Sequence, residues 1–337
     1  MRLIIDGNNT AYRSNSVMQL TTKTTGENVS AIYGTLAQIK TWVELFKSVT
    51  DVVVCWDFGH SQRRLAIYPA YKDKSKMRES QTEEDKQKFQ QFIDQMNQLH
   101  RFLPNIGVKS VKIEGWEADD LVYGLSSLTT DECILISTDQ DYYQLISDRV
   151  SVYNPCREKV YAITGVYKSA ETEKSGRKMD KSLYFANGDM IVSSFRDDVG
   201  YPLMAALSYK ILYGDDSDNI SGVPDVGEVT AKSLCDMYGS LVGILAARSL
   251  IMMSKGGQTW RAKKIFENMH ILQRNNLLIN LSLVDICTIK DTLMEVFSVP
   301  TSVNDKEVKK FFMNKEFVSF MSRYLSWISS FHSLANG

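Results

Sequence analysis

Cysteine, proline and long apolar runs are all scarce in this sequence. Its five cysteines stand apart, with no Cys-x-x-Cys pair, and several lie in apolar segments. This pattern disfavours a disulfide framework or a zinc site and fits a reducing compartment. Six prolines are too few to mark a rigid linker. Because the chain has neither an apolar stretch of membrane-spanning length nor the features of a signal peptide, we expect a cytoplasmic protein without membrane contacts.

Excess charge of one sign is also missing, since the net charge is only −1. There is thus no global attraction to nucleic acid. Charge is segregated locally instead: residues 63–78 hold six basic side chains against one acid, and residues 255–274 hold five against one. In the first run, tyrosines can stack on bases while the cations follow phosphates. The alternative is that the tyrosines pack a loop onto the core. The candidate single-strand-binding residues are Arg63, Arg64, Tyr68, Tyr71, Lys72, Lys74, Lys76 and Arg78.

Short β-branched runs alternate with helix-length amphipathic segments. This alternation is typical of an α/β fold whose mostly parallel central sheet is flanked by helices. The predicted strands are residues 3–5, 52–55, 108–113 and 133–136. The predicted helices between them are residues 32–46 and 83–103.

The second half of the chain has a different pattern. Residues 157–196 predict a hairpin insertion, with strands at 159–163 and 182–185. Helical periodicity dominates afterwards, beginning with 202–213 and ending in an apolar helix over 317–331 that we expect to dock on the protein's own core. We therefore predict an α/β core over 1–200 and a mainly helical lobe over 201–337.

An acid closely follows each predicted strand. The carboxyl ends of parallel strands share one edge of a sheet, so these acids should converge there. Clustered carboxylates raise each other's pKa unless cations lie among them. Oxygen ligands without histidine or thiol partners favour Mg²⁺ or Mn²⁺. The acids concerned are Asp6, Asp57, Glu117, Asp119, Asp120, Asp139 and Asp141.

The segment EGWEADDL predicts a finer arrangement. Glu117 and Asp120 are three residues apart and share a helix face, whereas Asp119 points elsewhere. One segment could then serve two ions, of which one activates water and the other stabilises the leaving oxygen of a phosphodiester. Lys72 could add electrostatic stabilisation. For any single acid the alternative is a helix N-cap, as for Asp139 before 140–145.

Six segments together resemble the 5′ nuclease or flap endonuclease superfamily in order and spacing. Within it, the resemblance is to bacteriophage 5′→3′ exonucleases, including phage RNase H-like members, and to the 5′ nuclease domain of bacterial DNA polymerase I. It covers roughly residues 1–290 and implies a PIN-like core, a helical arch over about 68–100 and a helix-hairpin-helix-type element over 214–238. The segments are IDGNNTAYR (5–13), VVCWD (53–57), YPAYKDKSKMR (68–78), EGWEADDL (114–121), ISTDQDYYQL (136–145) and GDDSDNISGVPDVG (214–227).

The resemblance implies a two-metal 5′→3′ exonuclease and flap endonuclease of DNA replication and repair, using Mg²⁺ with Mn²⁺ as a substitute. The RNA of an RNA–DNA hybrid is a candidate further substrate. Asp215 and Asp218 join the seven acids above at metal-ligand positions, and Lys72 matches the lysine at the base of the arch. Ser75 stands where a second basic residue is usual, which Lys74, Lys76 or Arg78 could replace.

The segment GVPDVG resembles a helix-hairpin-helix turn, whose glycines let backbone N–H groups approach a duplex phosphate. Asp225 stands where a third glycine is usual, and its charge would repel phosphate. The resemblance also implies a candidate monovalent-cation site at 222–227. The DNA-binding residues implied here are Gly222, Val223, Gly227 and Lys232.

The expected partner is DNA with 5′ ends, flaps or nicks. Replication proteins, namely a single-strand-binding protein, a clamp or a polymerase, are candidate partners of the apolar tail. We expect a monomer, in the host cytoplasm if the gene is a bacteriophage's. Two alternatives are a non-catalytic structure-specific DNA-binding protein of the same fold and a PIN-like ribonuclease. Cleavage of flapped DNA against single-stranded RNA separates them.

Overall fold

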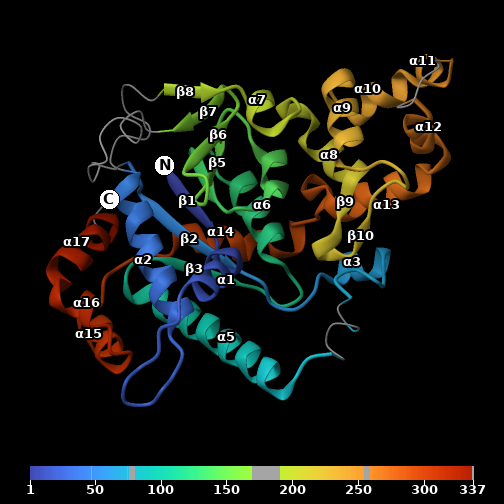
Figure 1. Ribbon diagram of the computed structural model, residues 1–337. Coiled ribbons are helices and arrows are strands. Elements are labelled where there is room, and N and C mark those ends of the chain that lie inside the picture. The colour runs from blue at the N-terminus through green and yellow to red at the C-terminus, as the bar shows by residue number, and fades with distance from the viewer. Residues whose placement is uncertain (47, 74, 76–79, 169–189, 254–258, 336–337) are drawn as a thin grey trace.

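A computed structural model gives the fold and describes residues 1–46, 48–73, 75, 80–168, 190–253 and 259–335. Its centre is a sheet in the order β3-β2-β1-β4-β5-β6-β7-β8 (Figure 1). The first five strands in this order are parallel, and the remaining pairings are antiparallel. The strands are β1 (Arg2–Asp6), β2 (Asp51–Trp56), β3 (Lys109–Lys112), β4 (Cys133–Ile136), β5 (Val150–Asn154), β6 (Lys159–Ala162), β7 (Gly165–Lys168) and β8 (Met190–Ser193).

The predicted strands β1 to β4 are each found within one residue of their expected bounds. Their apolar runs are continuous because both faces of the sheet are covered: Leu3 and Ile5 pack on one face, and Ile4 packs on the other. β5 was not predicted. β6 matches the strand expected at 159–163, whereas the strand expected at 182–185 lies outside the described residues. The hairpin β6–β7 continues the central sheet and does not stand apart from it.

Three helices from the first half of the chain cover the face that Leu3 and Ile5 share. Two match the predicted helices. The most polar begins with a capping box, in which Thr82 and Asp85 each accept a hydrogen bond from the other's backbone N–H. These helices are α1 (Gly7–Val17), α2 (Ser30–Leu45) and α5 (Glu83–Phe102). Residues 74 and 76–79 of the predicted arch lie outside the described residues.

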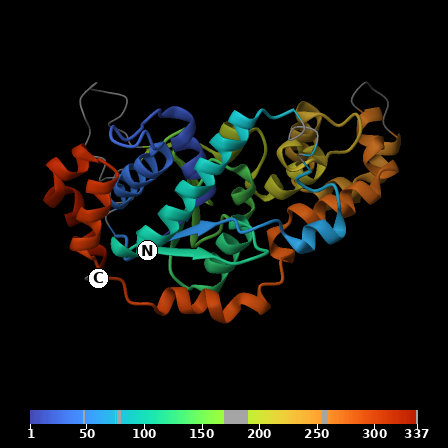
Figure 2. The same ribbon diagram turned by 90° about the horizontal axis from the view of Figure 1, so that it is seen from below.

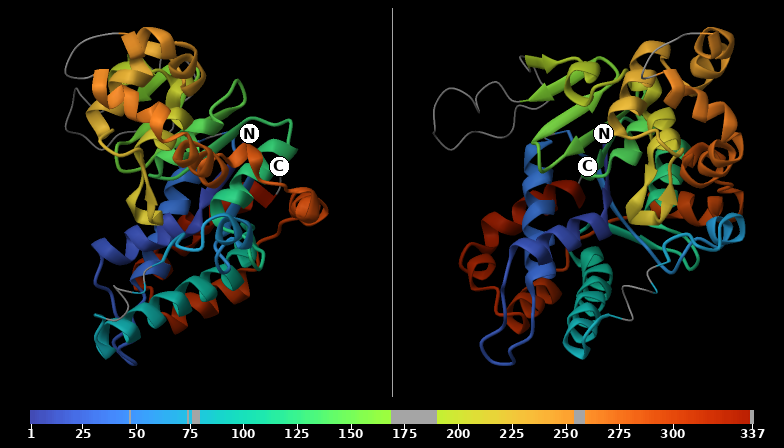
Figure 3. Two further views of the ribbon diagram at one scale, coloured as in Figure 1. Left: turned by 90° about the vertical axis from the view of Figure 1, so that its right-hand side faces the viewer. Right: turned by 45° about the vertical axis from the view of Figure 1, so that its right-hand side comes forward.

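The opposite face carries α6 and part of a helical lobe. The lobe projects on the far side of the sheet from the C-terminal helices, as Figures 1 and 3 show. A short α3 (Gln62–Ile67) links the core to it. The helices here are α6 (Ala118–Leu128), α7 (Phe195–Val199), α8 (Ala206–Tyr213), α9 (Glu228–Tyr238), α10 (Leu241–Ala246), α11 (Arg248–Met253), α12 (Thr259–Glu267) and α13 (Met269–Ile279).

The last helices leave the lobe and return to the core. α14 (Lys290–Ser298) packs under α6, and α15 (Asp305–Asn314), α16 (Val318–Ser322) and α17 (Tyr324–Ala335) pack beside α2 and α5 (Figure 2). Phe320 stacks on Tyr33 with ring centroids 4.4 Å apart, and Phe311 stacks on Phe102 at 3.9 Å. Docking of the apolar tail on its own core is therefore confirmed. The division at residue 200 stays a prediction.

Two glycines of the segment GDDSDNISG are required by close backbone approach. β9 (Gly214–Asp215) pairs with β10 (Ile220–Ser221) in a tight antiparallel turn. Gly214 has φ +84°, and a Cβ there would lie 2.3 Å from the Ile220 carbonyl oxygen. A Cβ on Gly222 would lie 2.1 Å from the Tyr213 carbonyl oxygen. Only glycine fits either position, and the turn places Asp215 and Asp218 at the sheet edge.

Among the described residues, none of the helices combines the length and apolarity that a membrane crossing needs.

Candidate metal centre

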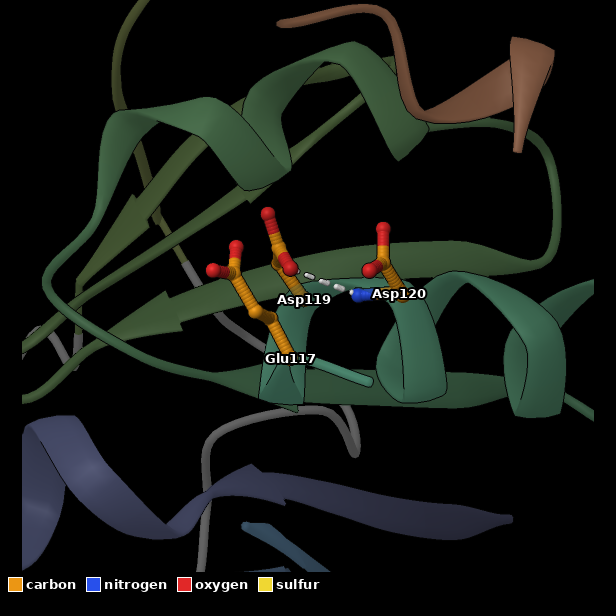
Figure 4. A group of neighbouring side chains, drawn as sticks. All are labelled: Glu117, Asp119 and Asp120. Atoms are coloured by element: carbon orange, nitrogen blue, oxygen red, sulfur yellow. Dashed lines mark hydrogen bonds between the residues drawn. The ribbon is translucent and has the colours of Figure 1, made fainter. Parts of the chain in front are cut away.

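Among the described residues, Glu117, Asp119 and Asp120 form the tightest acidic group. Each offers a carboxylate oxygen within 4.8 Å of the others (Figure 4). The expectation that Asp119 points elsewhere is wrong. Helix α6 begins at Ala118, and Glu117 precedes it with an extended backbone (φ −96°, ψ 157°). Because Glu117 is not part of the helix, the three-residue face rule does not apply to it, and all three side chains turn to one side.

Two of the predicted DNA-contacting residues lie inside this group. The Arg64 side chain is only 2% exposed; its Nη1 donates to Glu117 and Asp120 at 2.9 Å each, and its Nη2 lies 3.0 Å from Asp119. The buried Tyr71 hydroxyl donates to Glu117 at 2.7 Å. Neither side chain is free to follow a DNA strand, so the structure corrects both predictions. Buried carboxylates need nearby donors, and these two supply them.

Lys72 connects this group to the GDDSDN turn. Its Nζ lies 3.2 Å from Glu117 and 3.8 Å from Asp218. Its backbone N–H donates to the Asp218 carbonyl oxygen at 2.9 Å, with the Lys72 backbone at φ +51°. Burial alone would lower the pKa of Lys72, but Asp218 and Glu117 outweigh it and raise that pKa above its ordinary value. Lys72 is therefore a fixed, protonated cation at the edge of the acids.

A second acidic group surrounds Lys210. Its acids were predicted from the sequence, but Lys210 was not. Its Nζ lies 2.8 Å from Asp141 Oδ1 and 2.7 Å from Asp215 Oδ2. Asp139 accepts the Asp141 backbone N–H at 2.9 Å, so the cap interpretation of Asp139 is confirmed, although a cap leaves its other oxygen available. The one signal for Lys210 in the sequence is a lysine on an otherwise apolar helix directly before GDDSDN.

Asp6, the last residue of β1, and Asp57, which directly follows the neighbouring β2, lie between the two groups. Asp6 caps α1 through the Asn9 N–H at 3.0 Å and accepts the Ser137 hydroxyl at 3.1 Å. Asp57 accepts the Ala118 N–H at 2.7 Å, at the start of the helix that carries Asp119. The strand-end acids therefore converge on one edge, as the parallel sheet predicts.

Burial shapes the electrostatics of this edge. It raises the pKa of Asp6, Asp57 and Asp218 to about 6, and neighbouring carboxylates add to the effect. Burial and the adjacent acids Asp119 and Asp139 raise the pKa of Asp120 and Asp141 in the same way. The three built-in cations thus leave part of the negative charge uncompensated, and a further cation would stabilise the ionised acids.

The charges and the ligand types test whether a metal fits. Asp120 Oδ1 lies 2.9 Å from Arg64 Nη2, and Asp141 Oδ1 lies 2.8 Å from Lys210 Nζ. Each acidic group nevertheless holds more carboxylates than built-in cations. The available ligands are all carboxylate oxygens, which suit a hard divalent cation. The residues fit such an ion.

Stability should depend on pH and metal together. Between the ordinary aspartate pKa of about 4 and the raised values of about 6 in Asp6 and Asp57, the folded chain holds protons that the unfolded chain has lost. The free energy of unfolding of the metal-free protein should therefore fall as pH rises through this window. We expect a higher Tm at about pH 5 than at about pH 8, and a larger rise with Mg²⁺ at the higher pH, because the ion needs ionised ligands.

Thermal melts in EDTA and in Mg²⁺ at the two pH values check this expectation. Potassium chloride at matched ionic strength serves as the control for general screening. Equal Mg²⁺ effects at both pH values would contradict it.

The other predicted DNA contacts are more scattered. Arg63 donates to the Leu277 carbonyl oxygen at 2.8 Å, and Tyr68 is half-buried with Arg274 over its ring at 4.7 Å. Lys74, Lys76 and Arg78 lie outside the described residues. Packing of Tyr68 and Tyr71 against the protein, the alternative interpretation, is thus the arrangement found.

The GVPDVG turn is partly committed to internal contacts. The Val223 N–H donates to the Leu212 carbonyl oxygen at 2.9 Å and the residue is buried, which corrects the expectation that this amide meets a phosphate. Gly227 is exposed at the start of α9 with open space around it. Lys232, one turn into α9, pairs with Glu228 at 2.9 Å. Asp225 takes φ +65°, a backbone conformation that aspartate adopts more readily than most residues, in place of the usual glycine.

Comparison with known proteins supports the architecture. A family model for the 5′-3′ exonuclease N-terminal resolvase-like domain matches residues 1–175. A Bacillus subtilis 5′-3′ exonuclease is 28% identical over 272 residues, which is 80% of this chain and 78% of that protein. The thermostable DNA polymerase I of Thermus aquaticus is 29% identical over 247 residues, 72% of this chain but 24% of that protein. The chain thus spans about a quarter of the length of the polymerase relatives it matches.

Solved structures share the fold. The flap endonuclease of bacteriophage T5, in a complex with DNA and metal ions, has a TM-score of 0.65 at 19% identity and covers 88% of this chain and 99% of its own. The catalytic core of Rad2 with a DNA substrate has a TM-score of 0.51 at 14% identity, covering 93% and 87%. Because the family model spans more than half of the sequence, the chain belongs to the 5′-3′ exonuclease family.

Proposed function

We propose that this protein is a Mg²⁺-dependent nuclease that hydrolyses phosphodiester bonds at the 5′ ends of DNA, as a 5′→3′ exonuclease and a flap endonuclease. The observation that carries the proposal is the pair of acidic groups on one sheet edge, each with more carboxylates than neighbouring cations. Membership of the 5′-3′ exonuclease family supports it. So does the likeness to a T5 flap endonuclease solved with DNA and metal ions.

The acids would divide between two ions. Glu117, Asp119 and Asp120 would hold one ion, with Asp57 beside them. The group around Lys210 would hold the other. When bound, the pair supplies an activated water and stabilises the leaving oxygen. The second group consists of Asp139, Asp141 and Asp215, with Asp6 beside it and Asp218 nearer to Lys72.

Lys72 would stabilise negative charge on the reacting phosphate. Its side chain is 23% exposed and places the ammonium beside Glu117, at the edge of the acids. The contacts with Glu117 and Asp218 keep it protonated, and its backbone N–H bond to Asp218 fixes where the side chain begins. A preorganised cation of this kind costs no reorganisation as charge develops.

Duplex contacts are assigned to the lobe. The exposed start of α9 at Gly227 offers backbone N–H groups to a phosphate, and Lys232 follows one turn later. The arch segment over about 68–100 would meet the single-stranded 5′ end. The same proposal includes a domain boundary at residue 200 and a monovalent cation bound at 222–227. It also includes an RNA–DNA hybrid as a substrate and contacts with replication proteins.

Product mapping tests the function. A 5′-labelled flap, a nicked duplex and an RNA primer on DNA are incubated with the protein in Mg²⁺, in Mn²⁺ and in EDTA. We expect short 5′ products from the flap and the nick with either ion and none in EDTA. Tight flap binding without cleavage in both ions would favour the non-catalytic DNA-binding protein. Preferential cleavage of single-stranded RNA would favour the ribonuclease.

A further inference from the structure

Arg64 makes contacts that suit a support for the metal centre. It lies on α3 with its side chain only 2% exposed. Its Nη1 donates to Glu117 Oε2 and Asp120 Oδ2 at 2.9 Å each, and its Nη2 donates to Asp119 Oδ2 at 3.0 Å. The planar guanidinium thus touches all three acids of the tightest group, a task that needs several donors in fixed directions.

The remaining donor of Arg64 points the other way, to the end of α13. Its Nε donates to the Leu278 carbonyl oxygen at 3.0 Å. The last carbonyl groups of a helix have no partner within it, and three successive ones in α13 are taken up by side chains of the core. Arg63 binds Leu277 at 2.8 Å and Gln144 binds Ile279 at 3.2 Å.

Gln144 ties the second acidic group to the same helix end. Its Nε2 also donates to the Asp141 carbonyl oxygen at 2.9 Å, and its Oε1 accepts the Leu281 N–H at 2.9 Å. Both acidic groups are therefore attached to the C-terminus of α13. This helix belongs to the lobe and contacts α3.

The middle of α13 is fixed to α8 and to β10, the strand that follows the GDDSDN turn. The fully buried Asn275 donates to the Ile211 and Ser221 carbonyl oxygens at 3.0 Å each. Arg274 donates to Ser221 at 2.8 Å. One helix therefore connects the turn that carries Asp215 and Asp218 with the supports of the two other acidic segments.

We propose that Arg64 is a positioning residue that holds Glu117, Asp119 and Asp120 in their metal-receiving arrangement and anchors that arrangement to the end of α13. Its burial leaves it no surface with which to touch DNA, so it acts only through the carboxylates. It separates the acids and contacts both oxygens of Asp120, Oδ2 through Nη1 and Oδ1 through Nη2, at 2.9 Å each. The role of this arrangement in cleavage rests on the proposed function, whereas its role in metal binding does not.

The test replaces Arg64 with lysine, which keeps the charge but cannot bridge three carboxylates and a carbonyl. Mn²⁺ binding to the protein without DNA is measured by calorimetry, and kcat, KM and the Mg²⁺ half-saturation are measured on a 5′ flap. We expect R64K to weaken Mn²⁺ binding by about 10–100-fold, the range for supports of metal ligands, and to lower kcat with KM for DNA unchanged.

Arg149→Lys is the matched control, because Arg149 also bonds a carbonyl at a helix end, that of Thr129 after α6, but contacts none of the acids. Unchanged Mn²⁺ affinity in a folded R64K protein would overturn the inference even if the wild type cuts flaps. Weakened Mn²⁺ binding in R64K, with a wild type that cuts no DNA, would leave the inference standing and reject the proposed function.

A second variant covers the case in which R64K does not fold. Gln144→Met keeps the side chain's length and removes its bonds to Asp141 and Ile279. We expect weaker Mn²⁺ binding and a lower kcat, without a change in KM. Wild-type Mn²⁺ affinity in Q144M would show that attachment to α13 does not position the acids and would overturn the proposal.

Discussion

Replacing Asp119 with asparagine is expected to lower the cleavage rate on a 5′ flap by about 10²–10³-fold or more, the scale of losing one preorganised electrostatic element. The change removes one charge from the acidic group and leaves its shape intact. The protein should still fold, because Asp119 is 28% exposed and asparagine can still accept the Asp120 N–H. Single-turnover rates across a Mg²⁺ titration measure the effect, and DNA affinity in EDTA is expected to persist.

Asp216→Asn is the control for this variant. Asp216 is exposed on the GDDSDN turn, next to the proposed ligand Asp215, and it has the same charge and size as Asp119. Its loss should leave the rate unchanged if position matters and total charge does not. Equal rates for Asp119→Asn and the wild type would reject the assignment of this group to metal binding.

Replacing Lys72 with alanine is expected to lower the single-turnover rate by about 10²–10³-fold, with a much smaller change in duplex affinity. The ammonium lies at the edge of the acids and contacts two of them, so its loss removes both a cation for the phosphate and a partner for Glu117 and Asp218. Lys72→Arg should recover part of the rate, because it keeps the charge but not the compact ammonium.

Lys86→Ala controls for a general loss of positive charge. Lys86 is exposed on α5 and pairs with Glu83 within one helical turn. Rates are measured at saturating protein, and affinities are measured separately in EDTA. A loss of affinity that fully accounts for the lower rate of Lys72→Ala would assign Lys72 to binding and not to the reaction.

The strands and their acids could be predicted because their signals are local. β-branched runs bounded by polar residues gave β1 to β4, and parallel pairing brings the residues that follow them to one edge. The strand β5 was missed because it directly follows the polar stretch after η2 (Gln140–Leu145) and its apolar run is interrupted by Ser151. Its place beside β4 depends on pairing, which periodicity does not specify.

The basic residues of the site were harder to interpret from the sequence. Arg64 and Tyr71 lie in a run that resembles an exposed nucleic-acid-binding stretch, yet buried acids more than 45 residues away in the sequence draw them inward. Lys210 is the opposite case, a lysine within an apolar helix whose partners are Asp141 and Asp215. Whether a charged side chain is buried depends on its partners in the folded protein, and a single sequence does not reveal those partners.

The return of α15 to α17 to the side of α2 and α5 has a consequence for how the chain is made. The ribosome releases the apolar faces of α2 and α5 long before the aromatic residues that cover them. Until the last helices emerge, the nascent chain exposes an uncovered apolar surface, a condition that favours aggregation or chaperone capture. Contacts between such distant segments also slow folding. A premature stop before α15 would therefore leave the earliest-made face of the core uncovered.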